Sequence, residues 1–227
     1  MTDIVLASDL TISRGGRTLV SGLTLGLSAG SVTALTGPNG SGKTTLARCL
    51  GLYDLDFNGT VRVDDRATQT ISARELRALH QGTIVIQPQE LMLEPSWSAL
   101  RNLTYAAWAL GLPRRCRKRT AHEVLERVGA SHLANTTVER LSGGEQARIA
   151  IARLLLSPDP RLMILDEPTA SGDRALRDLV SDVIRSTVGR GAAVLLISHD
   201  QALRSLTDVE IPVGADASGA ADRTHRS

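Results

Sequence analysis

One stretch decides the fold of this chain, and it runs Gly37-Pro38-Asn39-Gly40-Ser41-Gly42-Lys43-Thr44. Its spacing, G-x-x-x-x-G-K-T, is that of a phosphate-binding loop. The glycines allow successive backbone N–H groups to converge on one phosphate. The charge of Lys43 is directed at the outer phosphates, and the hydroxyl of Thr44 is placed to ligate Mg²⁺. The stretch therefore predicts a nucleotide site.

The segments on both sides of this loop have the patterns that the motif needs. Residues 31–36 are apolar and β-branched, which predicts a buried strand. Residues 45–50 predict the first turns of a helix, whose positive dipole end would face a bound phosphate. This strand–loop–helix context favours a nucleotide site over a glycine-rich turn matched by chance.

Three further apolar runs predict more core strands, at residues 83–86, 162–165 and 193–197. They alternate with helical patterns, which is typical of a parallel α/β sheet. Polar residues follow directly at the end of each run, namely Gln87, Asp166-Glu167 and Ser198-His199. Because ligands of such sheets bind at the carboxyl ends of the strands, we expect these side chains beside the loop.

The N-terminal segment predicts antiparallel strands. Residues 4–27 alternate apolar and polar positions, with turns expected at Gly15-Gly16 and Ser21-Gly22. Residues 60–63, after Asn58-Gly59, predict one more strand.

A helical insertion is predicted after Gln87. The aromatic residues Trp97, Tyr105 and Trp108 lie in it and are expected to pack its own small core; the alternative is a groove for a partner. The basic run 114–119 is interpreted as a solvated face rather than a binding patch.

Composition sets broad limits on the function. The 227 residues are 42% hydrophobic and 22% charged, as in soluble globular proteins, and their number favours one domain with a sizeable insertion. The net charge of +2 gives no reason to expect a nucleic-acid partner. Two cysteines, Cys49 and Cys116, are too few for a disulfide framework and favour a reducing, cytosolic setting. The sequence shows neither a signal peptide nor an apolar run of about 18 residues that could span a membrane.

Taken together, the motifs from about residue 4 to 212 resemble those of the ATP-binding cassette (ABC) family, the motor subunits of ABC transporters. The matches are Gly37–Thr44 with the Walker A motif, Gln87 with the Q-loop glutamine, Leu141–Glu145 with the signature motif, Leu162–Asp166 with Walker B, Glu167 with the catalytic glutamate, Ala170–Asp173 with the D-loop and His199 with the switch histidine.

The resemblance implies an α/β P-loop NTPase core with a parallel sheet, an antiparallel β subdomain and a helical insertion subdomain. We expect the ATPase domain at 1–213 with the insertion at about 88–140. The small and polar residues of the remainder, 214–227, predict a disordered tail.

The resemblance also implies the site residues, with ATP and Mg²⁺ as cofactors. Mg²⁺ would be held by Thr44, Gln87 and Asp166. Glu167 would orient and polarise the attacking water, His199 would donate a hydrogen bond to the γ-phosphate, and Gln87 would report the state of the site. The nucleotide-binding residues would be Arg14, Gly37, Pro38, Asn39, Gly40, Ser41, Gly42, Lys43, Thr44, Thr45, Ser142, Gly143 and Gly144.

Three positions depart from the common family pattern. Arg14 stands near the place of an aromatic residue that stacks on adenine, so its guanidinium would stack there or contact with the base would be weak. Gly172 replaces the usual leucine of the D-loop and is expected to loosen it. Glu145 replaces the commoner glutamine of the signature motif.

In the family, the signature residues Ser142–Gly144 complete the ATP site of a second cassette, so a homodimer or a pair of paralogues is implied. The chain would power a separate membrane permease from the cytoplasmic, inner face of the cell membrane. The predicted docking surface is Leu91, Met92, Leu93 and Trp97. One alternative is a soluble ABC-type ATPase acting on ribosomes, DNA or iron–sulfur assembly. The other is a regulatory module that binds ATP without turnover, against which Glu167 and His199 argue.

Overall fold

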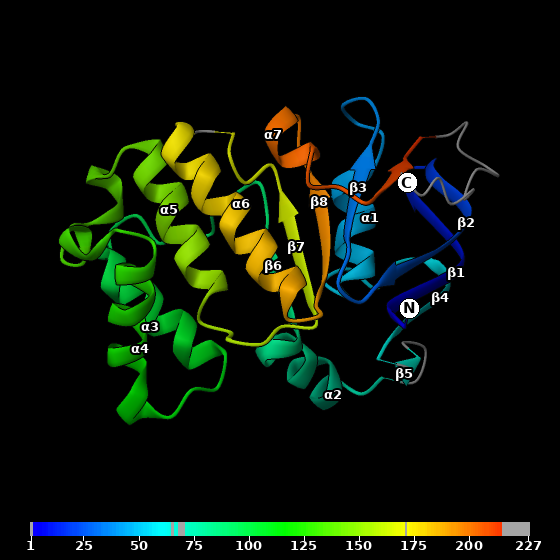
Figure 1. Cartoon of the computed structure of the whole chain (residues 1–227). Coiled ribbons are helices and arrows are strands. Elements are labelled where there is room, and N and C mark those ends of the chain that lie inside the picture. The colour runs from blue at the N-terminus through cyan, green and yellow to red at the C-terminus, as the bar shows by residue number, and fades with distance from the viewer. Residues whose placement is uncertain (1, 65, 68–70, 171, 215–227) are drawn as a thin grey trace.

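Figure 1 shows the computed structural model, which describes residues 2–64, 66–67, 71–170 and 172–214. A parallel sheet stands at the centre, between a helical segment and a separate antiparallel sheet. This arrangement confirms the predicted α/β fold class. The predicted tail lies outside the described residues from position 215 onward.

The parallel sheet has the strand order β6-β7-β8-β3-β9, and every neighbouring pair is parallel. The loop stretch therefore follows an interior strand, β3, and the carboxyl ends of β6, β7 and β8 lie along the same side of the sheet. The strand β9 was not predicted, because it is short, half-exposed and ends in proline. The bounds are β3 Val32–Thr36, β6 Ile84–Gln87, β7 Leu162–Asp166, β8 Ala193–Ile197 and β9 Val209–Pro212.

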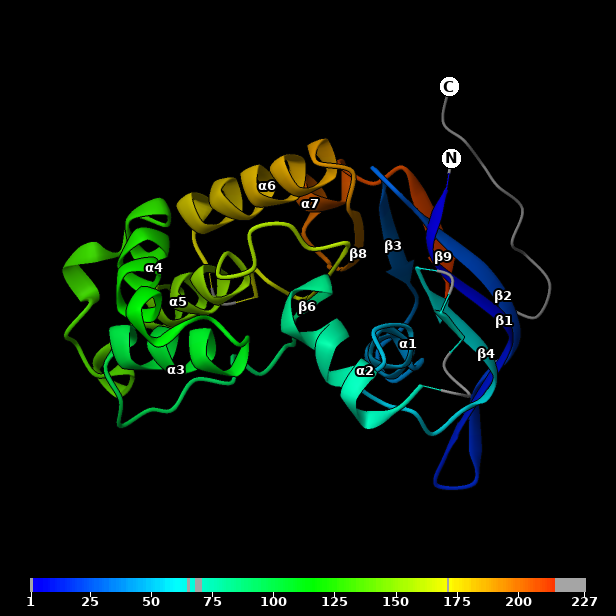
Figure 2. The ribbon, with the colours of Figure 1, turned by 90° about the horizontal axis from the view of Figure 1, so that it is seen from below.

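The parallel sheet buries both of its faces, because side chains alternate between them along each strand. On β8, Leu195 packs on one face with helix α1 (Lys43–Leu50), and Leu196 packs on the other with α5 (Gly143–Leu154) and α6 (Arg174–Gly189). Figure 2 shows α1 lying between the two sheets, and the buried apolar side chains of α1 join both of them into one core. This double burial explains why the core strands read as continuous apolar runs.

The antiparallel sheet has the strand order β2-β1-β4-β5. The predicted turn at Gly15-Gly16 is confirmed, with both glycines at positive φ. The turn predicted at Ser21-Gly22 is wrong, because β2 continues through it: Gly22 has a φ of 61°, and its N–H donates to Thr11 Oγ1 over 3.0 Å. Asn58-Gly59 likewise belongs to a strand, as the first two residues of β4. The bounds are β1 Asp3–Arg14, β2 Arg17–Ser28, β4 Asn58–Val63 and β5 Arg66–Ala67.

The remaining helices include the predicted insertion. Its own core is built from small and aliphatic side chains, among them Leu103 and Leu125, which are fully buried. No helix among the described residues is long and apolar enough to cross a bilayer. The bounds are α2 Ala73–Ala78, α3 Ala99–Ala109, α4 Arg114–Arg127 and α7 Gln201–Arg204, with shorter turns at Leu79–Thr83, Ser131–Leu133 and Val138–Arg140.

The three aromatic residues of the insertion do not form its core, so that expectation was wrong. Tyr105 and Trp108 are each 52% exposed. They continue a line of rings that starts at Trp97, with ring centroids 5.3 Å and 5.2 Å apart. Arg101 lies over the ring of Trp97 at 4.3 Å. Tyr105 and Trp108 lie on the exposed side of α3, and Trp97 precedes that helix by two residues.

Candidate active site

The loop between β3 and α1 forms a cradle for an anion. Gly37, Gly40 and Gly42 have φ values of 137°, 75° and 99°, which side chains other than glycine rarely adopt. A Cβ on Gly37 would also collide with the carbonyl oxygen of Val213. The helix begins at Lys43, with Gly42 as its N-cap, so its first N–H groups face the loop. Such a terminus binds phosphate, and the loop geometry therefore fits a nucleotide.

The side chain of Lys43 folds back over this loop. Its Nζ donates to the carbonyl oxygens of Gly37 and Pro38 over 2.8 Å and 2.9 Å. These carbonyls stand in for the anionic oxygens that a phosphate would offer at the same ammonium group. The loop thus holds the ammonium group of Lys43, the only charged side chain of the motif, next to the site for an anion.

Thr44 and Asp166 bring two oxygen ligands together from the first turn of α1 and the end of β7. Thr44 Oγ1 donates to Asp166 Oδ2 over 2.7 Å. Burial raises the pKa of Asp166, while the hydrogen bond from Thr44 and the charge of Lys43 oppose that shift. A hydroxyl and a carboxylate are the hard ligands that Mg²⁺ prefers, so the pair fits that ion.

Gln87 ends β6, the strand beside β7, and its side chain is buried. Its Nε2 donates to the carbonyl of Pro88 over 2.9 Å. Its Oε1 is buried with no hydrogen-bond partner within the part of the chain that the structure describes. A buried acceptor without a partner is costly, and a metal ion or its water would satisfy it. Gln87 therefore also fits the predicted Mg²⁺ site.

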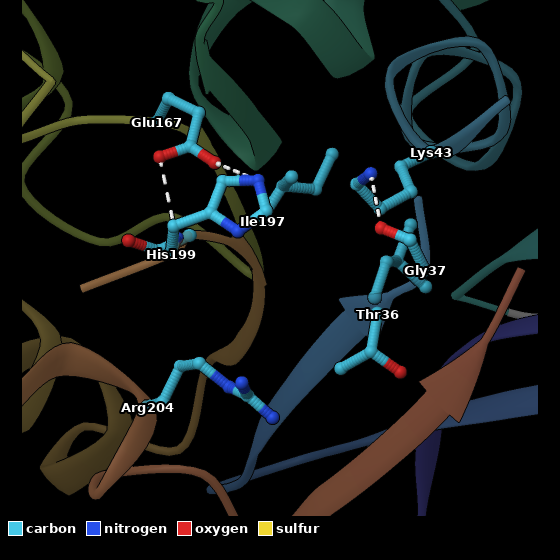
Figure 3. A pocket seen from close by; sticks show the side chains of 9 residues that line it. Thr36, Gly37, Lys43, Glu167, Ile197, His199 and Arg204 are labelled. Atoms are coloured by element: carbon cyan, nitrogen blue, oxygen red, sulfur yellow. Dashed lines mark hydrogen bonds and ion pairs between the residues drawn. The ribbon is translucent and has the colours of Figure 1, made fainter. Parts of the chain in front are cut away.

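Glu167 and His199 face each other across the ends of β7 and β8. Glu167 has a φ of 48°, and its N–H donates to the carbonyl of Ile197 over 2.8 Å. His199 Nε2 lies 3.5 Å from Glu167 Oε1, and the N–H of His199 donates to Oε2 over 3.4 Å (Figure 3). Backbone strain of this kind collects at functional sites, where the surrounding structure fixes it.

A cavity of about 130 Å³ lies between these residues and the loop (Figure 3). Sequence reasoning placed three of its polar side chains, Lys43, Glu167 and His199. It missed Arg204, which reaches the cavity from α7. The only signal in the sequence was a basic residue five positions after His199. The lining residues are Leu35, Thr36, Gly37, Lys43, Glu167, Ile197, Ser198, His199 and Arg204.

The signature residues Ser142, Gly143 and Gly144 do not line this cavity. Ser142 is the N-cap of α5 and forms a capping box with Glu145: the Ser142 N–H and hydroxyl both donate to Glu145 Oε2 over 2.8 Å. These hydrogen bonds lower the pKa of Glu145. The motif is thus a rigid helix start at the surface, placed away from the loop of its own chain.

The guanidinium of Arg14 is held by two aspartates. Its Nη2 lies 2.7 Å from Asp54 Oδ2, and its Nη1 lies 3.1 Å from Asp56 Oδ2 and donates to the carbonyls of Ser13 and Asp56. The hydrogen bond to Asp54 is the main cause that raises the pKa of Arg14. The edges of the guanidinium are thereby occupied, so stacking on adenine would use its flat face. Stacking stays a prediction.

If Arg14 stacks on adenine, Arg14→Ala should weaken ATP binding by about 0.5–1 kcal/mol, the range for cation–π contacts at exposed sites. Arg14→Tyr should preserve or strengthen binding. Titration calorimetry would measure both, with Arg17→Ala on the neighbouring strand as the matched control. Equal affinities of the wild type and Arg14→Ala would reject stacking.

The D-loop is described except for Ser171. A Cβ on Gly172 would collide with the side chain of Leu176 on α6. Glycine is therefore needed for the close approach between this loop and the helix. Asp173 caps the same helix by accepting from the N–H of Leu176 over 2.9 Å. That Gly172 loosens the loop stays a prediction.

Comparison with known proteins agrees with this geometry. The family model described as ABC transporter matches residues 20–170. The chain is 34% identical over 197 residues to an uncharacterized ABC transporter ATP-binding protein of Mycobacterium tuberculosis, covering 87% of this chain but only 59% of that relative. It is 34% identical to the lipoprotein-releasing system ATP-binding protein LolD of Maricaulis maris, covering 92% of this chain and 93% of LolD.

A solved structure is also similar: a dimer of the ATP-binding cassette MJ0796 in a post-hydrolysis state, bound to ADP and Pi. It superposes with a TM-score of 0.80 at 25% identity and covers 92% of this chain and 94% of that one. The fold, the loop geometry and these matches lead to one conclusion: the chain belongs to the ABC transporter family.

Proposed function

We propose that this chain is the ATP-binding and hydrolysing subunit of an ABC transporter, which works as a pair of cassettes and powers a separate membrane permease. The observation that carries the proposal is the cavity in which Lys43, Glu167 and His199 meet at the carboxyl ends of parallel strands. The phosphate-bound state named for the MJ0796 cassette supports hydrolysis at such a site.

The residues of the site have separate roles in this proposal. The loop amides and Lys43 hold the outer phosphates of ATP. Thr44, Asp166 and Gln87 hold Mg²⁺, which supplies charge neutralisation on the phosphates. Glu167 orients the attacking water and accepts a proton from it as general base. His199 donates a hydrogen bond to the γ-phosphate, where negative charge collects during cleavage.

The signature residues serve a second copy of the cassette in this proposal. Ser142 is the N-cap of α5 and lies at the surface, and it does not line the cavity of its own chain. A helix N-terminus binds phosphate oxygens well, so the motif can close the site of a partner. The dimer named for MJ0796 supports a paired cassette.

The permease docks, in this proposal, on the segment after Gln87. Leu91 and Leu93 pack against the core, while Met92 between them is 68% exposed at a φ of 50°. Arg153 of α5 donates to the carbonyl of Met92 over 3.2 Å, which ties this segment to the signature helix. The chain then lies on the cytoplasmic face of the membrane. Its ATPase domain comprises residues 1–213, with the helical insertion at about 88–140.

Met92→Asp should abolish stimulation of ATP hydrolysis by the permease and leave the basal rate of the isolated chain unchanged. The substitution places a charge where an exposed apolar side chain would contact the permease. Aspartate also tolerates positive φ better than methionine does. Trp97→Asp and Leu93→Asp should act in the same direction, with more risk to the fold because both are half-buried. Leu55→Asp, on another exposed leucine, is the matched control.

The assay is the rate of ATP hydrolysis by the purified chain, alone and with the multispanning membrane protein that co-purifies with it. A wild-type rate that no membrane protein stimulates would favour a soluble ABC-type ATPase. A protein that binds ATP without any turnover would instead be a regulatory module. Unaltered stimulation of Met92→Asp would place the docking surface elsewhere.

A further inference from the structure

Arg204 is a cation at the active-site cavity that belongs to none of the motifs. Helix α7 starts directly after His199, because Asp200 caps it by accepting from the N–H of Ala202 over 2.9 Å. Leu203 is fully buried and anchors the helix, and Arg204, the last residue of α7, lines the cavity. Figure 3 shows the guanidinium of Arg204 extending into the space beside Thr36 and His199.

The lining of the cavity suits a phosphate. Lys43 and Arg204 contribute two positive charges from opposite sides, and Glu167 contributes one negative charge. The apolar side chains of Leu35 and Ile197 form part of the wall, which lowers the local dielectric and strengthens these charges. A volume of about 130 Å³ has room for a tetrahedral anion beside the ammonium of Lys43.

Arg204 also has a competing partner outside the lining. Its Nη2 lies 2.9 Å and 3.1 Å from the two carboxylate oxygens of Glu210 on β9. The two side chains are 41% and 46% exposed. An ion pair so exposed to water is weak, and it can give way to a doubly charged anion that approaches the same guanidinium.

We propose that Arg204 contacts the terminal phosphate, as the γ-phosphate of ATP or as free phosphate after cleavage, and that Glu210 competes with that phosphate for the guanidinium. The inference rests on the proposed ATP hydrolysis and adds a residue outside the family motifs to it. Glu210 then favours departure of the cleaved phosphate, because its carboxylate re-forms the ion pair with Arg204 and so removes the guanidinium from the phosphate.

Two neutral variants separate this role from a structural one. Arg204→Gln removes the cation, and Glu210→Gln frees it from its competitor. If the ion pair only braced α7 against β9, the two variants would break the same contact and change phosphate binding in the same direction. Competition requires them to act in opposite directions. Arg119→Gln and Glu123→Gln break an exposed ion pair on α4 and are the matched controls.

The experiment is an equilibrium titration of the ADP-loaded full chain with inorganic phosphate. Arg204→Gln should weaken phosphate binding about tenfold or more, as expected for one charge-assisted hydrogen bond. Glu210→Gln should strengthen it by about twofold to fivefold, the scale of an exposed ion pair. The double variant should behave like Arg204→Gln. Affinity for ADP alone should stay constant throughout.

A second arm compares ATP with ADP in Mg²⁺-free buffer. A reduced preference of Arg204→Gln for ATP shows contact with the γ-phosphate, and an effect on free phosphate alone shows contact only after cleavage. Unchanged phosphate affinity in Arg204→Gln, or parallel shifts in both single variants, would overturn the proposal. Wild-type protein that binds no ATP would instead overturn the proposed function.

Discussion

Glu167→Gln should lower ATP hydrolysis by about 10²–10⁴-fold, the contribution of a well-placed general base. Glutamine keeps the size and the hydrogen-bonding capacity of the side chain but cannot accept a proton from water. Glu167 is fixed by its backbone hydrogen bond to Ile197 and lies beside His199, so the substitution changes charge with little change in position. ATP binding should survive, because the loop and Lys43 are untouched.

The hydrolysis rate is measured as release of phosphate, and binding is measured separately with a fluorescent ATP analogue. Glu123→Gln, an exposed glutamate on α4, is the control for loss of a carboxylate. Turnover of Glu167→Gln at the wild-type rate would remove Glu167 as the base.

Lys43→Ala should fail in a different way and lose ATP binding itself. Its ammonium would make charge-assisted hydrogen bonds to phosphate oxygens, each worth about 1.5–3 kcal/mol, so affinity should fall roughly 10- to 150-fold. The lysine now donates to Gly37 and Pro38, so the substitution also removes two hydrogen bonds within the loop. Hydrolysis falls with occupancy, and saturating ATP restores part of it.

Lys118→Ala is the control, because Lys118 on α4 is the only other lysine in the chain. Titration calorimetry with ATP and with ADP measures the effect. Equal ATP affinity of Lys43→Ala and Lys118→Ala would contradict phosphate binding by the loop.

The sheet and its loop were predictable because local pattern and burial agree there. The apolar runs at 83–86, 162–165 and 193–197 are buried on both faces, so their patterns indicate strands without knowledge of the rest. The polar residues after them then follow from the rule for parallel sheets. The register shift between β1 and β2 near Gly22, where Leu10 pairs with Leu23 but Ile12 pairs with Val20, and the edge strand β9 were missed, because their pairing depends on distant partners rather than on local sequence.

Three of the polar side chains that line the cavity, Lys43, Glu167 and His199, could be placed from the sequence, but Arg204 and the contacts within the site could not. The pairing of Arg14 with Asp54 spans 40 positions, and that of Thr44 with Asp166 spans 122. Such contacts are set by tertiary packing, which no local pattern encodes. The exposed rings of Tyr105 and Trp108 on α3 show the same limit, since spacing identifies a helix but not which neighbour covers each face.

The central claim is that two copies close on ATP, with the signature motif of each completing the site of the other. Its most direct test is the mass of Glu167→Gln by size-exclusion chromatography with light scattering, in Mg²⁺-free buffer with ATP. The matched variant adds Ser142→Asp, which keeps a good N-cap for α5 but sets a negative charge against the γ-phosphate.

We predict that Glu167→Gln with ATP has about twice the 24.2 kDa mass of one chain, and that ADP returns it to the single-chain mass. Adding Ser142→Asp should give the single-chain mass while ATP remains bound. A single-chain mass for Glu167→Gln under saturating ATP, both alone and with the membrane partner that co-purifies, would contradict the paired arrangement. A dimer that survives Ser142→Asp would contradict it equally.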